Sequence, residues 1–143
     1  MKKLLTLSVL FISTLSYGQR EMAEALKSDH VTLLNQNINE SNKNNCLEIK
    51  GSEYNLLSIA IKMDSKKVFE ALISKHSVDL DKICEDKTPL MYAIKYGRED
   101  MVSELLSAGA NLDKKSRKGK TAIYYAEKYD QKSILKILNG FKR

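Results

Sequence analysis

A six-residue pattern recurs in this chain at a fixed spacing of 33 residues. Thr88–Ala93 (TPLMYA) returns as Thr121–Ala126 (TAIYYA), and Asn55–Ala60 (NLLSIA) stands one period upstream. Apolar residues keep the same spacing in the segments that follow: Val68, Met101 and Ile134, and Leu72, Leu105 and Leu138. A period of this size is typical of units that bury their apolar faces only by stacking on one another. The sequence therefore predicts an all-α, elongated stack of about four helix–turn–helix units.

The best-defined unit has clear signals for the ends of its two helices. Thr88 is a good N-cap, and Pro89 follows at the first helical position, where a missing N–H costs nothing. Gly97 is expected to end the first helix in a left-handed conformation. The second helix is predicted over Glu99–Ser107 by its apolar spacing, and Gly109 stops it.

Two of these glycine positions carry other residues in neighbouring copies. Asp64 and Asp130 stand where the best copy has Gly97, and His76 stands where it has Gly109. Asp tolerates positive φ better than most residues, and His shares some of that tolerance. These turns are therefore expected to form, at some cost in free energy.

The segment between Lys87 and Lys120 resembles an ankyrin repeat. The matching residues are Thr88-Pro89-Leu90, Ala93, Gly97, Leu105-Leu106, Gly109-Ala110 and Gly119. The resemblance extends over almost everything after residue 19, with approximate repeats at 20–50, 51–83, 84–116 and 117–143. It implies one domain, 20–143, folded as an ankyrin-repeat solenoid with finger-like turns between the helix pairs.

The first 19 residues have the features of a signal peptide. Lys2 and Lys3 precede a twelve-residue apolar stretch, and small residues around Gly18 place cleavage before Gln19. The stretch is shorter than the ~20 residues that a membrane-spanning helix needs. The sequence thus predicts a bacterial protein exported to the periplasm or secreted, with a signal peptide of residues 1–18 or 1–19. An uncleaved membrane anchor is the alternative.

Two cysteines, Cys46 and Cys84, are present, and neither belongs to a CxxC pair. In the repeat frame both fall in finger turns of successive units. Export permits a disulfide, and the longer finger could fold over to bring the two sulfurs together. The alternative is two unpaired thiols whose Cα atoms lie beyond the ~7 Å limit for bridging. The sequence leaves both readings open.

The finger between the first two copies is longer than the others. Asn55 follows Asn39 by sixteen positions, whereas Thr121 follows Asp113 by eight. The insertion, residues 40–54, is rich in Asn and hydrophilic, which is typical of a solvated loop. Loops also carry recognition residues more often than their share, so a role in contacting a partner stays open.

The sequence contains no arrangement that favours catalysis. His30 and His76 are the only histidines, each in a predicted turn and without a partner at ligand spacing. No phosphate-binding glycine loop or nucleophile motif occurs. The interpretation is a non-enzymatic protein without cofactor, catalytic residue or metal site.

The resemblance to ankyrin repeats implies contacts through the fingertips and the exposed side of each first helix, which line a concave face. In this chain that face is expected to carry a row of lysines beside a row formed by one Met and two Tyr side chains. Its residues are Lys62, Met63, Lys87, Lys95, Tyr96, Arg117, Lys118, Lys120, Lys128 and Tyr129. Cations beside aromatic residues complement an acidic partner.

The function expected from this face is binding of an acidic protein partner by a monomer in the bacterial envelope or the secreted fraction. The alternative function is binding of an anionic polymer, nucleic acid or an acidic glycan, through the same basic groove. Without Lys2 and Lys3 the formal net charge falls only from +6 to +4, a bias too small to favour nucleic acid. A third possibility is that the lysines are simply a solvated face.

Overall fold

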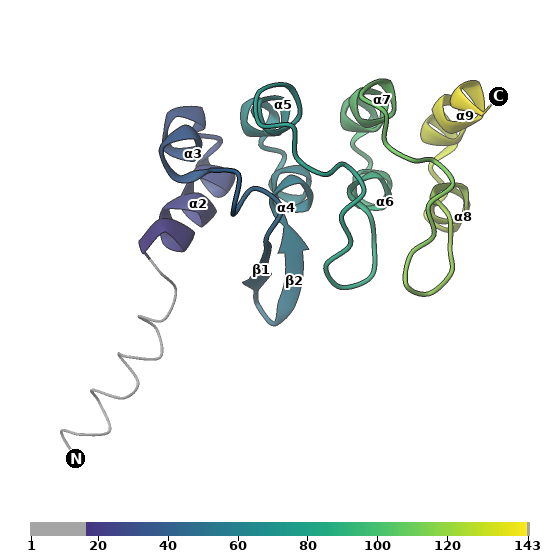
Figure 1. Ribbon diagram of the computed structural model, residues 1–143. Coiled ribbons are helices and arrows are strands. Elements are labelled where there is room, and N and C mark those ends of the chain that lie inside the picture. Colours follow the sequence, from purple (N-terminus) through teal and green to yellow (C-terminus); the bar gives the residue numbers. More distant parts are fainter. Residues whose placement is uncertain (1–16, 143) are drawn as a thin grey trace, which may run out of the picture.

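The computed structural model describes residues 17–142 as four helix pairs in a row (Figure 1). The first helices of the pairs form one row, the second helices form another, and the loops between pairs project from the same side (Figure 1). The elements are α2 (Tyr17–Ser28), α3 (Val31–Asn37), β1 (Cys46–Ile49), β2 (Ser52–Asn55), α4 (Leu56–Met63), α5 (Lys66–Ser74), α6 (Pro89–Lys95), α7 (Glu99–Ser107), α8 (Ala122–Lys128) and α9 (Lys132–Phe141).

The 33-residue period of the sequence is the period of the helices. The first helices α4, α6 and α8 begin 33 residues apart, as do the second helices α5, α7 and α9. Leu57, Leu90 and Ile123 are each the second residue of their helix. The first two are 1% exposed, and Ile123 is partly buried in the last layer. The predicted stack of helix pairs is therefore confirmed.

The start of each of these first helices is fixed by a polar side chain. Asn55, Thr88 and Thr121 accept hydrogen bonds from the N–H groups three residues on, at 2.7, 3.3 and 3.5 Å. Each bond satisfies one backbone donor that the helix itself leaves unpaired. Pro89 occupies the first helical position, as predicted. The second helix of the third pair spans Glu99–Ser107, which confirms its predicted bounds.

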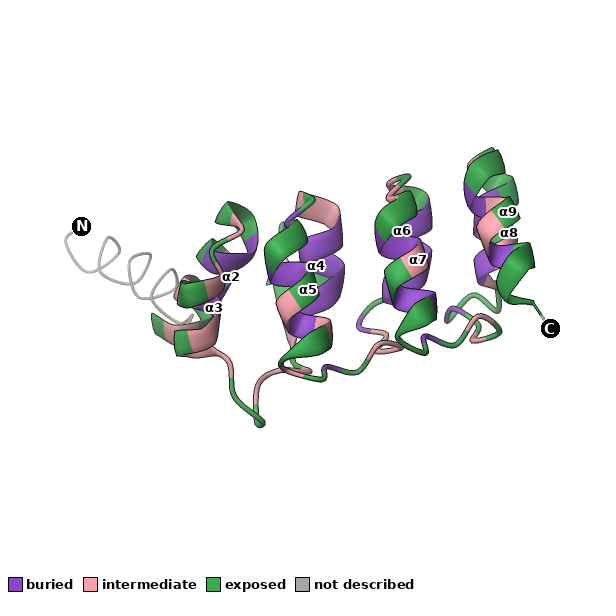
Figure 2. Cartoon of the chain, turned by 90° about the horizontal axis from the view of Figure 1, so that it is seen from above, coloured by how far each residue is buried: buried purple, intermediate pink, exposed green. Residues whose placement is uncertain are grey.

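The core lies between successive layers, where buried residues face one another along the whole row (Figure 2). Small residues permit the close approach: Ala60, Ala93 and Ala126 are at most 1% exposed. Ile61 and Ile94 are fully buried at one position of the inner layers, whereas the last layer carries the exposed Glu127 there. The outer side of the fourth pair is accordingly more polar, as a terminal repeat requires.

Three of the tight turns within the pairs use a left-handed residue at the same position. Its φ is 57° at Asp64, 67° at Gly97 and 51° at Asp130. The expectation that Asp would replace glycine in this conformation is confirmed. The turn at Gly97 also contacts the preceding pair, because the Nε of Arg98 donates to the Ile61 carbonyl at 3.2 Å.

The prediction for His76 is wrong, because Ser77 is the left-handed residue after α5, with φ of 47°. The Val78 N–H bonds the Leu72 carbonyl six residues back, whereas the Ala110 N–H reaches only five residues back. The turn after α5 is thus one residue longer. The His76 Nε2 instead lies 2.8 Å from the Asn35 Oδ1 of the first pair.

The insertion between the first two pairs is not the irregular loop that its composition suggested. β1 and β2 pair in antiparallel register from Cys46 opposite Asn55 to Ile49 opposite Ser52. Lys50 and Gly51 connect them with φ of 51° and 81°. Positive φ at both central residues is the geometry of the two-residue turn that matches strand twist. We call residues 46–55 the hairpin.

The predicted signal peptide lies mostly outside the described residues. Its last residues, Tyr17–Gln19, form the beginning of α2. The buried residues of α2 come later, at Met22, Ala25 and Leu26. Cleavage before Gln19 would therefore shorten α2 without removing its core contacts.

Candidate partner-binding groove

The three predicted pairs of a lysine and a large side chain lie at the carboxyl ends of the first helices. Lys62 and Met63 close α4, while Lys95 with Tyr96 and Lys128 with Tyr129 close α6 and α8. The two later lysines are exposed, and the other four side chains are partly buried. The repeat thus brings these residues to equivalent positions in successive layers. Their contact with a partner stays a prediction.

The aromatic row is longer than the sequence suggested. Tyr92 stacks on Tyr96 with 6.5 Å between ring centroids, and Tyr125 stacks on Tyr129 at 6.2 Å. Tyr54 of the hairpin reaches Tyr92 at 5.4 Å. Tyr92 and Tyr125 are one period apart, which is a signal that could have identified them, but the role of Tyr54 depends on the fold of the hairpin.

Besides Lys87, four lysines of the described residues lie over the faces of tyrosine rings in or beside this row. The distances from Nζ to the ring centroid are 4.6 Å for Lys62 on Tyr54, 5.6 Å for Lys95 on Tyr96, 4.6 Å for Lys120 on Tyr124 and 5.8 Å for Lys128 on Tyr129. Such contacts stabilise by about 0.5–1 kcal/mol at exposed sites. They hold the ammonium groups at fixed places while leaving them open to an anion.

Lys87 does not behave as a free fingertip cation. Its Nζ lies 3.2 Å from Asp86 Oδ2 and 5.2 Å from the Tyr125 ring centroid, and 16% of the side chain is exposed. Burial opposes its charge, but the hydrogen bond to Asp86 and the nearby Tyr125 raise the pKa of Lys87 above its ordinary value. The charge is satisfied within the protein, so little of Lys87 is left for a partner.

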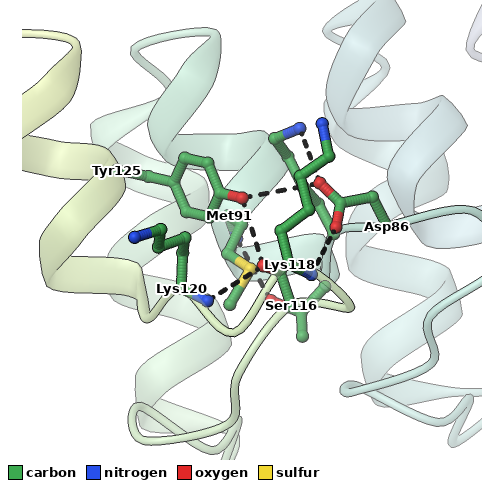
Figure 3. A network of polar contacts seen from close by, with 8 residues as sticks. Asp86, Met91, Ser116, Lys118, Lys120 and Tyr125 are labelled. Atoms are coloured by element: carbon green, nitrogen blue, oxygen red, sulfur yellow. Dashed lines mark hydrogen bonds and ion pairs between the residues drawn. The ribbon is translucent and has the colours of Figure 1, made fainter.

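Asp86 is the centre of a polar network that joins two successive fingers (Figure 3). Its carbonyl accepts from the Arg117 N–H at 3.0 Å, and its Oδ1 accepts from the Lys118 N–H at 3.2 Å. The Tyr125 hydroxyl donates to Ser116 Oγ at 3.2 Å and lies 3.5 Å from Asp86 Oδ2. We call these contacts the Asp86 network.

The Asp86 network also changes how its carboxyl titrates. Partial burial would raise the pKa of Asp86, but the hydrogen bonds from Lys87 and the Lys118 N–H, with the two lysine charges, lower it below its ordinary value. Asp86 is therefore an anion at neutral pH, neutralised by Lys87. Burial beside Tyr54 and Glu85 raises the pKa of the Tyr92 hydroxyl, which keeps this ring neutral.

The side chains of Arg117, Lys118 and Lys120 are exposed on the finger before α8. In the part of the chain that the structure describes, no ion pair involves any of the three, nor Lys95 or Lys128. These five cations and the tyrosines beside them form the candidate binding surface, which we call the basic groove.

Cys46 of the hairpin is bonded to Cys84 of the next finger, with 5.7 Å between the two Cα atoms. Hydrogen bonds reinforce this attachment. The Asn55 Nδ2 donates to the Lys82 carbonyl at 2.8 Å, and the Asp79 N–H donates to Asn44 Oδ1 at 2.7 Å. The hairpin is thereby held against the neighbouring finger (Figure 1). Its Ser52 and Tyr54 line one hollow with Lys95, Arg117 and Lys118, so the hairpin lies next to the basic groove.

The family model of ankyrin repeats (3 copies) matches this chain over residues 16–116 and 57–142. The chain belongs to the ankyrin-repeat family. The family model and the helix pairs together establish an all-α ankyrin solenoid. Ankyrin repeats mediate protein–protein interactions, and the family is an interaction fold rather than an enzyme fold.

Two curated relatives share part of this ankyrin-repeat domain. Neurogenic locus notch homolog protein 1 of Xenopus tropicalis is 37% identical over 71 residues, which are 49% of this chain and 3% of that protein. Neurogenic locus notch homolog protein 2 of Homo sapiens is 32% identical over 90 residues, 61% of this chain and 4% of that protein. The chain thus matches only a small part of the length of these relatives.

No helix among residues 17–142 is both long and apolar enough to span a bilayer.

Proposed function

We propose that this ankyrin-repeat protein binds an acidic surface of a protein partner through the basic groove. The observation that carries the proposal is a row of exposed cations that form no ion pair within residues 17–142, beside an ordered row of tyrosines. The cations are Lys95, Lys128, Arg117, Lys118 and Lys120. Aromatic residues and arginine are enriched at protein interfaces, and complementary charge speeds encounter and selects the partner. No catalytic step, cofactor or metal is part of this function.

The proposed place of action is the periplasm or the medium of a bacterial cell. The charged start, apolar stretch and small residues of the first 19 positions support export, and a disulfide is stable where conditions are oxidising. Amino-terminal sequencing of the protein from fractionated cells tests this. A mature chain starting at Gln19 or Arg20 is expected, and an intact Met1 in the cytoplasmic fraction would contradict export.

Charge reversal tests the role of the basic groove. The Lys95→Glu, Lys128→Glu double variant and the wild-type protein are immobilised and exposed to the exported protein fraction, and captured proteins are identified. The Lys132→Glu, Lys136→Glu variant changes the same charge on the exposed side of α9 and is the matched control. An acidic protein captured by the wild type and the control, but at least about tenfold more weakly by the groove variant, is the expected result.

Salt dependence separates this function from its alternative, binding of nucleic acid or an acidic glycan by the same cations. The finger at residues 113–120, DKKSRKGK, carries five cations and one carboxylate. This charge favours neither an acidic protein nor an anionic polymer as the ligand. Polymer binding loses affinity steeply with salt and tolerates many sequences. Tight, strongly salt-dependent binding of heparin or single-stranded DNA, with no protein captured, would replace the proposed function by the alternative.

A further inference from the structure

A hollow of about 420 Å³ lies in the basic groove between the hairpin and the finger before α8. Ser52 and Tyr54 of the hairpin form one wall, and Arg117 and Lys118 of the finger lie opposite. Its remaining lining residues are Glu85, Asp86, Lys87, Tyr92 and Lys95. Cavities of this size accommodate small ligands or a few side chains. The hollow therefore has room for a short segment of another chain.

The charges around this hollow are unevenly matched. Asp86 and Lys87 form an ion pair with each other at 3.2 Å. Lys95, Arg117 and Lys118 are exposed, and none takes part in an ion pair within the described residues. Opposing these three cations is one exposed carboxylate, that of Glu85, which is also outside any ion pair among residues 17–142. The hollow complements carboxylates, and Glu85 weakens that complementarity.

The wall formed by the hairpin depends on contacts made far along the chain. The Cys46–Cys84 bond joins positions 38 residues apart and holds the hairpin against the finger. The Tyr54 ring packs on Tyr92, and the Lys62 Nζ donates to the Tyr54 hydroxyl at 3.2 Å. A two-stranded hairpin by itself is only marginally stable in water. Without the bond, the position of Ser52 and Tyr54 would be less well defined.

We propose that this hollow binds a short acidic segment of the partner protein, and that the disulfide-held hairpin is the element that raises its affinity. Carboxylates of the segment bind Lys95, Arg117 and Lys118, while Tyr54 closes the hollow on the opposite side. The proposal rests on the proposed function and deepens it, since it assigns the insertion, residues 40–54, a part in partner recognition.

The test measures fluorescence anisotropy of a labelled oligo-glutamate peptide, with oxidised wild-type protein as the reference. Glu85→Gln removes the opposing carboxylate and should tighten binding about threefold, a change opposite in sign to any loss of folding. The Cys46→Ser, Cys84→Ser variant should weaken binding about tenfold. Tyr54→Ser should also weaken peptide binding. Because this variant keeps the disulfide, its effect does not depend on the loss of stability expected in the cysteine variant.

The outcomes separate this inference from the proposed function. If Lys95→Glu, Lys128→Glu abolishes binding while Glu85→Gln, Tyr54→Ser and the cysteine variant all leave it unchanged, the groove binds acidic segments but the hairpin-walled hollow is wrong. If the Lys95→Glu, Lys128→Glu variant binds like the wild type, the proposed function itself fails. If the Lys132→Glu, Lys136→Glu control loses as much affinity for the peptide, the attraction is nonspecific, and the proposal that the hollow is the binding site is overturned as well.

Discussion

The two fingers on either side of the hollow are held in place in different ways. The hairpin is a pair of strands fixed by a covalent bond between Cys46 and Cys84. The finger before α8 contains no strand and is fixed by hydrogen bonds of the Asp86 network. Both lead from a second helix to the next first helix, and in both cases an Asn or Thr side chain caps the start of the following helix.

The difference teaches that the solenoid fixes only the ends of each finger. Closing a longer loop costs little additional entropy, so the stack tolerates an insertion. The insertion buries its few apolar residues only in part, with Leu47, Ile49 and Tyr54 against the core. The disulfide adds a covalent attachment to these contacts of the hairpin, whereas the shorter finger is held by polar contacts with its neighbour.

Removing the disulfide that attaches the hairpin should have the largest effect on the free energy of unfolding. In the chain-entropy model, the bond that joins residues 38 apart stabilises the folded state by about 4 kcal/mol. The Cys46→Ser, Cys84→Ser variant should lose about that much free energy of unfolding in urea. Mass spectrometry of unreduced, alkylated wild-type protein is expected to find no labelled thiol, and two labelled thiols would contradict the bond.

Breaking the polar attachment should cost less. Asp86→Ala leaves the Lys87 ammonium and the Lys118 N–H without their carboxylate, which should lower the free energy of unfolding by about 2 kcal/mol. Glu85→Ala, at the neighbouring exposed carboxylate, is the matched control and should change it by less than about 0.5 kcal/mol. Similar losses in the two variants would mean that the Asp86 network does not hold this finger.

Acid should loosen the polar attachment and leave the covalent one. Because the folded-state pKa of Asp86 lies below its ordinary value of 3.8, its carboxylate stabilises the fold above that value. This contribution is lost as pH falls through the lower, folded-state pKa. The amide proton resonance of Lys118 should therefore titrate with a midpoint below 3.8. A midpoint above 3.8, or one unchanged in Asp86→Asn, would show that Asp86 is not the titrating group.

Much of the fold could be predicted because its signals are local and repeated. The cap at Thr88, the proline after it and the left-handed Gly97 act within a few residues of chain, and the apolar period reports packing between adjacent layers. Asp64 and Asp130 were predictable for the same reason. The turn at His76 was not, since a glycine-free turn can lengthen by a residue and transfer the left-handed conformation to Ser77.

The candidate site was predictable only in part. The period places Lys62, Lys95 and Lys128 at equivalent positions, and the structure agrees with that placement. The internal use of Lys87 could not be read from the sequence, because Asp86 next to it becomes its partner only where both pack against the next finger and the ring of Tyr125. The hairpin was missed because each strand has only four residues, so the alternation of Leu47, Glu48 and Ile49 is too short to stand out, and its turn is Lys50-Gly51 rather than a more typical pair.

The sequence by itself determined the layers, the helix boundaries in the middle of the stack and the row of lysines, since each layer contacts only its neighbours and repeats one set of local signals. The tertiary structure alone decided that Cys46 meets Cys84, that Tyr54 lies on Tyr92, and which cations form no ion pair among the residues that the structure describes. These features join separate fingers, and their geometry depends on the paths of two loops rather than on any pattern within one.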